Sequence, residues 1–225
     1  MRRVAKLYRS SVGKKILMAC TGLILFLFIV GHMVGNLKVL SGPEAFNHYA
    51  EFLREIGYPL LPHQSFLWMF RAVLLAAVVV HATSALLLWR SSRAARSEGY
   101  GKKKDISFTY ASRTMRWGGV ILALFIVYHL LHLTVGSIHP DFIPGDVYHN
   151  YVVAFQSPLI FGFYVVAQAA LCFHLYHGLW SVTQTLGASH PKYNPIRRPV
   201  AVVLSLGIFV GFLIPPVLVL AGVVS

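Results

Sequence analysis

The fold is decided by residues 172–184, "CFHLYHGLWSVTQ", which carry His174 and His177 one helical turn apart. They lie within a longer run, residues 147–191, that contains no Asp, Glu, Lys or Arg. An apolar segment of about 20 residues is long enough to cross a bilayer as a helix. A histidine inside such a helix is energetically costly and usually has a function. The stretch therefore predicts a transmembrane helix that holds a chemically active group.

The rest of the chain has a similar composition. It is 56% hydrophobic and only 12% charged, whereas soluble domains carry about 25% charged residues. We therefore expect an all-α integral membrane protein, with one domain over residues 1–225. The first four transmembrane helices should form an antiparallel bundle, and the last, which has no histidine or charge, should lie at its periphery. The five expected spans are residues 15–38, 65–89, 117–138, 157–185 and 199–222.

Positive charge is distributed asymmetrically between the loops. Seventeen of the 20 Lys and Arg residues lie in segments 1–15, 90–116 and 185–199, and five of the seven acidic residues lie on the opposite side. The positive-inside rule then predicts a multi-pass protein of the cell (inner, cytoplasmic) membrane, with its N-terminus in the cytoplasm and its C-terminus outside. Topology thus accounts for the net charge of +13, and no nucleic-acid partner is expected.

Two segments outside the spans have a surface character. Residues 43–57 are too polar to cross the membrane, but their apolar side chains recur at helical spacing, which predicts an amphipathic helix on the outer surface. Residues 90–105 form a basic loop. Such a loop acts as a topology signal, as a docking surface for a soluble partner, or as a contact for anionic membrane lipid.

The eleven histidines fall into two groups. Each of the first four spans contains at least one, while Lys, Arg, Asp and Glu are absent from the span interiors. A proton-relay transporter would mix histidine with carboxylates, whereas neutral imidazole is a good ligand for iron, copper or zinc. Any one of them could instead be a core residue bonded to a carbonyl. The span histidines are His32, His81, His129, His132, His174 and His177; the loop histidines, expected to be solvated, are His48, His63, His139, His149 and His190.

Depth within the spans divides the span histidines into an outer and an inner level. His32, His129 and His132 lie outward of the span midpoints, and His81 and His174 lie inward. At 1.5 Å per residue the two levels are roughly 10–13 Å apart. Two bis-histidine haems stacked across the bundle fit this arrangement, whereas zinc would need three or four ligands at one level.

Small and basic residues complete the candidate site. Gly31 and Gly35 flank His32, where they either clear space for a porphyrin or allow close helix packing as a GxxxG motif. Haem propionates require cations or hydroxyls near the bundle ends. The cationic candidates are Lys14, Lys15, Arg113 and Arg116 at the inner level and Arg71 at the outer level, although each could serve only as a snorkelling or topology residue.

Five motifs together resemble one family. "GHMVGN" with His32, the following "GPEAFN", "VVVHATSA" with His81, "FIVYHLLH" with His129 and "HLYHGLWS" with His174 are similar to the cytochrome b membrane-anchor subunit of succinate dehydrogenases and fumarate reductases. The similarity is to the single-chain, five-helix, di-haem type that works with menaquinone, and it extends over nearly the whole chain.

The resemblance implies a ligand set. By position, His32 and His129 would hold the iron of the outer haem b, and His81 and His174 that of the inner haem b. His132 matches the depth of His32 slightly better than His129 does, and His177 is a second candidate in its span, so both remain alternatives. The family pattern H-x-x-x-G-L-W begins at His174, which favours that residue.

The resemblance also implies a role in electron transfer. A flavoprotein subunit and an iron–sulfur subunit would dock at the cytoplasmic face, and electrons would pass through the two haems to menaquinone, or in reverse for fumarate reduction. Succinate chemistry would take place in the partners, so no catalytic residue is expected here. A quinone takes up protons on reduction, and the titratable candidates near the outer surface are His48, Glu44, Glu51 and Glu55.

Two other functions use similar parts. The cytochrome b anchor of a different respiratory dehydrogenase also carries intramembrane histidines, but the distribution over four spans fits it less well. A small histidine-using transporter is disfavoured by the lack of inverted repeats and of intramembrane carboxylates.

Overall fold

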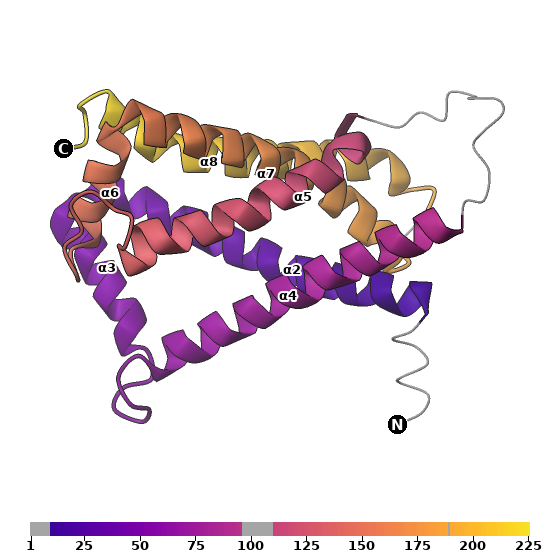
Figure 1. Ribbon diagram of the computed structural model, residues 1–225, viewed down its shortest axis with the longest axis horizontal. Helices are drawn as coiled ribbons and strands as arrows, with labels where there is room; N and C mark the ends of the chain where they lie inside the picture. The colour runs from indigo at the N-terminus through magenta and orange to yellow at the C-terminus, as the bar shows by residue number, and fades with distance from the viewer. Residues whose placement is uncertain (1–9, 96–109, 189) are drawn as a thin grey trace.

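The computed structural model describes residues 10–95, 110–188 and 190–225, and within them it contains helices and no strand. Those ranges contain seven α-helices, a 3-10 turn, η1, and a π-helical segment, η2 (Figure 1). Their bounds are α2 Ser11–Leu37, η1 Lys38–Ser41, α3 Pro43–Glu55, α4 Ser65–Ala94, α5 Tyr110–His129, η2 Leu130–Val135, α6 Val147–Gln156, α7 Pro158–Thr185 and α8 Asn194–Leu220.

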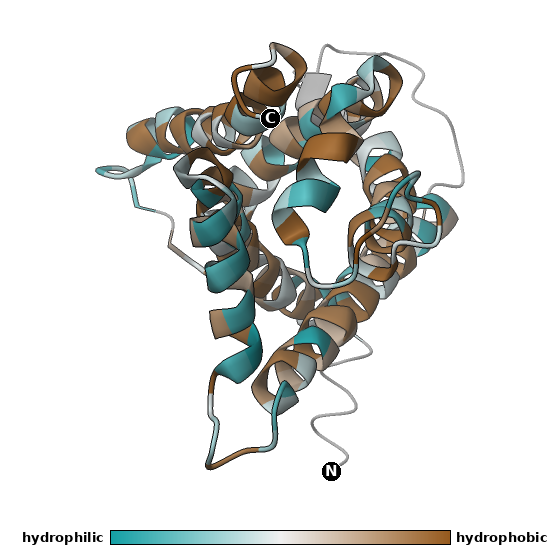
Figure 2. Cartoon of the chain, turned by 90° about the vertical axis from the view of Figure 1, so that its left-hand side faces the viewer, coloured by the Kyte–Doolittle hydropathy of each residue, from teal (hydrophilic) through white to brown (hydrophobic). Residues whose placement is uncertain are grey.

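Five of these elements are long and apolar enough to cross a membrane, which confirms the predicted all-α membrane architecture. Most of the residues in these segments are not buried inside the chain, so their apolar side chains are available to lipid. Figure 2 shows hydrophobic residues along the long helices and a more hydrophilic α3. The segments are Ser11–Ser41, Ser65–Ala94, Met115–Val135, Pro158–Thr185 and Asn194–Leu220, close to the predicted spans.

The long helices pack mainly in pairs. α2 lies along α4, α5 lies along α7, and α8 lies along both α7 and α2. The expectation that the last helix is peripheral is therefore wrong. Ala201, Ser205 and Gly211 are buried on one face of α8, and a Cβ at Gly211 would collide with the sulfur of Met33 on α2. Small residues let membrane helices approach closely, so α8 needs neither histidine nor charge to join the bundle.

One end of the bundle is closed by a cap. We call it the capped end: it carries α3, α6, the loop before α6 and the C-terminus, opposite the amino-terminal end where α2 begins (Figure 1). A hydrophobic cluster lies here, in which Phe46 of α3 packs against Tyr151 of α6, and Phe155 of α6 packs against Tyr164 of α7. The predicted amphipathic helix at 43–57 is α3, and its buried Phe46 anchors it to this cluster.

Helix α6 was not expected, because residues 139–156 read as a loop. It ends at Gln156, and the next residue, Ser157, is extended with a ψ of 117°. The residue before a proline is disfavoured in the α conformation, and Pro158 starts α7 at its first turn. The uncharged run 147–191 is therefore two helices with a break, a division that hydropathy alone does not reveal.

Asp146 joins α6 to α3. Its carboxylate accepts hydrogen bonds from the His149 backbone N–H (3.0 Å) and from Nδ2 of Asn47 (2.9 Å), whose Oδ1 in turn accepts from the Tyr148 N–H (3.0 Å). The His149 N–H, followed by the Asn47 amide, holds the pKa of Asp146 below its usual range. Asp146 is thus both the N-cap of α6 and the tie between the two cap helices.

Replacing Asp146 with Ala should lower the free energy of unfolding by about 1 kcal/mol, the usual cost of losing an N-cap. Because folding depresses this pKa, the carboxylate stabilises the protein fully above its unfolded value of about 3.9. That stabilisation is lost as pH falls through the lower folded value. Thermal unfolding in detergent should show the difference between wild type and variant at pH 7, and a smaller difference once the pH falls well below the unfolded value. A constant difference across this range would contradict the assignment.

Candidate functional site

Four span histidines from four helices meet in two pairs. His81 of α4 faces His174 of α7, with ring centroids 6.1 Å apart and planes at 60°. His32 of α2 faces His129 at the end of α5, with centroids 5.8 Å apart and planes at 80°. These are the two pairs that the sequence proposes as metal ligands, and each joins helices that are distant in the chain.

Met18 fixes the tautomer of His81. The Nδ1 atom of His81 lies 3.0 Å from the backbone oxygen of Met18 on α2. A carbonyl oxygen only accepts hydrogen bonds, so Nδ1 carries the proton and Nε2 keeps a free lone pair. An imidazole whose second nitrogen donates to a carbonyl is the usual form of a metal-bound histidine. His81 is therefore in the state required for a ligand.

Gly22 provides the space for the His81 ring. A Cβ built at Gly22 would lie 3.2 Å from Cε1 and 3.5 Å from Nδ1 of His81. Gly22 was not predicted from the sequence, because the glycines considered there were those that flank His32. The only available signal was a glycine inside an apolar helix at the inner level, opposite a histidine of another span.

His174, which faces His81, differs from it in its hydrogen bonding. Nδ1 of His174 is buried and has no hydrogen-bond partner among the residues that the structure describes. His177, one turn further along α7, instead packs edge-on against Trp180, with centroids 5.8 Å apart. A ring contact with His81 is recorded only for His174 within the described chain, so α7 turns His174 and not His177 toward α4.

Aromatic residues enclose the pair at the capped end. His32 stacks on Phe28 at 5.2 Å and lies 5.8 Å from Phe212 of α8. His129 packs on Phe125 at 5.7 Å. Helix α8 thus contributes a wall to the site, which follows from its position inside the bundle.

His132 occupies a different environment from His129. It lies in the π-helical segment η2, is fully buried, and places Nδ1 3.0 Å from the hydroxyl of Tyr164. Its ring stacks on His139 at 5.0 Å, and its Nε2 has no partner in the described residues. π-Helical turns often occur at functional sites. Here the segment presents His132 to Tyr164 and the cap, while His129 faces His32.

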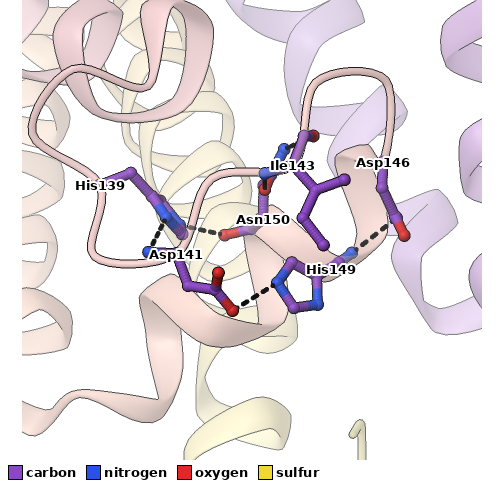
Figure 3. A network of polar contacts seen from close by, with 6 residues as sticks. All are labelled: His139, Asp141, Ile143, Asp146, His149 and Asn150. Carbon is purple, nitrogen blue, oxygen red and sulfur yellow. Dashed lines mark hydrogen bonds and ion pairs between the residues drawn. The ribbon is translucent and has the colours of Figure 1, made fainter.

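The expectation that His139 is solvated is wrong. It is 9% exposed, its Nε2 donates to the Asn150 carbonyl (2.8 Å), and its Nδ1 accepts from the Asp141 N–H (3.1 Å). The Asn150 amide in turn pairs with both backbone groups of Ile143 (2.8 Å each). Figure 3 shows this network at the capped end, with the His149–Asp141 ion pair (3.1 Å) beside it. A loop histidine gives no sequence signal of such a fold-back.

The other predicted site residues are more scattered. Among the described residues, a Cβ at Gly31 would meet nothing within 4 Å beyond its own stretch of helix, whereas one at Gly35 would lie 3.1 Å from the Tyr49 ring of α3. Gly35 therefore allows α2 to approach the cap. Arg71 stacks on Trp68 at 4.9 Å and Arg116 on Trp89 at 5.9 Å. Lys14 is half-buried and Lys15 is exposed, and the side chain of Arg113 lies outside the described residues.

The proposed quinone residues all lie exposed on α3. Glu51 is paired with Arg54 (2.9 Å) and His63 (3.5 Å). A cavity of about 470 Å³ opens at the end of α3, and its lining residues are Phe52, Glu55, Ile56, Gly57 and Tyr58. Of the four candidates, Glu55 alone lines this cavity, and Glu44 and His48 lie on exposed positions of the same helix.

Comparison with known proteins places this geometry in context. Residues 91–214 match the family model for the succinate dehydrogenase/fumarate reductase transmembrane subunit. The chain is also 24% identical over 184 residues to the succinate dehydrogenase cytochrome b558 subunit of Bacillus subtilis (strain 168), covering 82% of each chain. No solved structure matches it. The family match includes His129 and His174, and the curated relative extends the similarity over most of the chain.

Proposed function

Since this chain belongs to the succinate dehydrogenase/fumarate reductase transmembrane-subunit family, we propose that it carries electrons between a partner iron–sulfur subunit and menaquinone through two haems b. As a cytochrome b membrane anchor it associates with the flavoprotein and iron–sulfur subunits that handle succinate. The proposed ligands are His32 with His129 at the capped end and His81 with His174 nearer the amino-terminal end.

The observation that carries this proposal is the spacing of the two histidine pairs. A metal–imidazole bond is about 2.0–2.1 Å long, and a ring centroid lies about 1.1 Å behind its nitrogen, so two imidazoles that held one metal between them would have their centroids about 6 Å apart. The observed separations are 5.8 and 6.1 Å. Four neutral nitrogen donors, with no carboxylate in the membrane-spanning interior, suit haem iron better than a hard cation. The residues present therefore fit two haems.

Haem supplies one-electron chemistry that the side chains of this protein lack. The chain's own residues bind and orient the group: four helices each contribute one imidazole, and Met18 and Gly22 set the orientation of His81. Phe28, Phe125 and Phe212 surround the capped-end pair and exclude water. A dry, nonpolar wall is one of the means by which a protein sets a haem potential.

We place the soluble partners at the amino-terminal end and the quinone at the capped end. Charge supports this orientation. Among the described residues, the ends of α2, α4 and α5 at the amino-terminal end carry Lys14, Lys15, Arg90, Arg93 and Arg116, whereas the acidic α3 lies at the other end. Glu55 is the preferred proton-exchanging group for the quinone because it lines the cavity beside α3. Glu44, Glu51 and His48 are weaker candidates, and Glu51 is already paired with two basic side chains.

The direct test uses the complete complex in native membranes. Addition of succinate should convert the haem b of this subunit to its reduced form, which is seen in the visible spectrum. A quinone analogue should then reoxidise it. Reduction by dithionite but not by succinate, in a complex whose soluble subunits still oxidise succinate with an artificial dye, would contradict the electron route.

Replacing Gly22 with Ala should weaken the binding of the haem that His81 is proposed to ligate. The added methyl group would press on the His81 ring at 3.2 Å, and overpacking costs about 1–3 kcal/mol. On mild heating in detergent, the variant should lose the inner haem earlier than wild type, while the outer haem is retained. Gly207→Ala is the control, because in the described part of the structure a Cβ there meets nothing within 4 Å outside its own turn of helix. Equal retention in both variants would show that Gly22 does not set the ring position.

A further inference from the structure

The hydroxyl of Tyr164 lies between two histidines of the neighbouring chain segment. It is 3.0 Å from Nδ1 of His132 and 3.4 Å from Nδ1 of His129. Tyr164 is 6% exposed and belongs to the hydrophobic cluster of the capped end. A phenol has one proton to donate and lone pairs that accept, so a single hydroxyl can serve both nitrogens, one as acceptor and one as donor.

We propose that Tyr164 is a positioning residue for the outer haem, acting through His129; this inference rests on the proposed function. Coordination through Nε2 leaves Nδ1 of His129 protonated, so His129 donates to the Tyr164 oxygen. The Tyr164 O–H then donates to Nδ1 of His132. Ligation at His129 would therefore fix the direction of both hydrogen bonds of the Tyr164 hydroxyl.

The contact between Tyr164 and His129 should affect the haem potential. An acceptor at the second nitrogen of a metal-bound histidine orients the ring and raises its basicity. For His81 that acceptor is the backbone oxygen of Met18, which no substitution removes. For His129 it is a side chain on another helix. The distance of 3.4 Å between His129 Nδ1 and the Tyr164 oxygen is at the long end of hydrogen bonding. The contact therefore orients the His129 ring without holding it tightly.

The contacts continue from Tyr164 into the cap. His132, whose Nδ1 accepts the hydrogen bond from the Tyr164 hydroxyl, stacks on His139 at 5.0 Å. His139 is in turn fixed by Asn150 and Asp141 (Figure 3). The His132 ring is therefore held between the Tyr164 hydroxyl and the His139 ring. This gives the Tyr164 O–H one well-defined direction in which to donate. The cap thereby helps to orient His129 through His132 and Tyr164.

Tyr164→Phe should retain both haems and raise the midpoint potential of the outer one. Losing the acceptor makes His129 a weaker donor, which favours ferrous over ferric iron. We expect about a tenfold change in the ratio of reduced to oxidised outer haem at a given ambient potential, equal to about 59 mV for one electron. The low-spin ferric resonance of the outer haem should also move, while the inner haem keeps its potential and its spectrum.

Tyr128→Phe is the matched control. Its ring also packs against His132 (5.2 Å) and Tyr164 (6.1 Å), but no hydrogen bond of its hydroxyl is recorded in the described part of the chain. This variant should titrate like wild type. Identical potentials in wild type, Tyr164→Phe and Tyr128→Phe would overturn the inference while the proposed function stands, because haem would still be present.

His132→Phe keeps the proposal testable if Tyr164→Phe does not assemble. It keeps an aromatic ring in place and removes the acceptor of the Tyr164 proton, which makes the Tyr164 oxygen a poorer acceptor for His129. A smaller upward shift of the outer potential alone supports the inference. An unchanged outer potential in this variant overturns it. A wild-type protein without haem would instead refute the proposed function.

Discussion

His81→Ala is expected to remove one of the two haems and to leave the other in place. His81 faces His174 at 6.1 Å and is set in the ligand tautomer by Met18, so its loss leaves the inner iron with one axial nitrogen. The b-type absorbance should fall by half. Electron transfer from succinate to quinone should fall more than about 100-fold, because even indirect partners of a metal ligand are worth about 10–100-fold.

The matched control at this level is His177→Ala. His177 packs against Trp180, and the described residues record no contact between its ring and that of His81. The variant should keep both haems and most of the activity. Loss of the inner haem in His177→Ala, with retention in His174→Ala, would show that the wrong histidine of α7 had been assigned.

His129→Ala should produce the opposite spectrum, with the outer haem lost and the inner haem retained. His129 is the histidine of this segment that faces His32, at 5.8 Å, while the buried His132 faces Tyr164 and His139. Succinate should still reduce the inner haem, and reduction of quinone should fall by more than about 100-fold. Optical redox titration resolves the two haems and measures which one remains.

His132→Phe separates the two candidates at the capped end. It should retain two haems, with only the small shift of the outer potential described above. If His132→Phe lost the outer haem and His129→Ala kept it, depth in the membrane would have been the better guide, and the pairing seen across α2 and α5 would have no role in ligation.

Much of the architecture could be predicted from the sequence. Uncharged runs mark membrane helices reliably because an unpaired charge in lipid is so costly, and all five spans agree with the structure. Depth sorted the histidines into the levels where His32 meets His129 and His81 meets His174. Position along a helix gives height above the membrane midplane almost directly, at 1.5 Å per residue.

Rotation of the helices could not be predicted in the same way. His129 and His132 lie three residues apart, and hydropathy does not decide which of them faces α2 when the whole segment is apolar. The π-helical turn after His129 adds a local change of register. Packing decides such questions, and it also explains why Gly22, Tyr164 and the inward face of α8 escaped notice. Their importance depends on what lies opposite them on another helix.

The haem content of the purified subunit tests the central claim most directly. Haem extracted as its pyridine complex, divided by protein measured by amino-acid analysis, gives a stoichiometry. A reduced-minus-oxidised spectrum identifies the haem type. We predict two haems b per chain, resolved as two one-electron components in a redox titration. A chain that is folded and inserted in the membrane but carries no haem, or a single haem with all four histidines intact, would contradict the assignment.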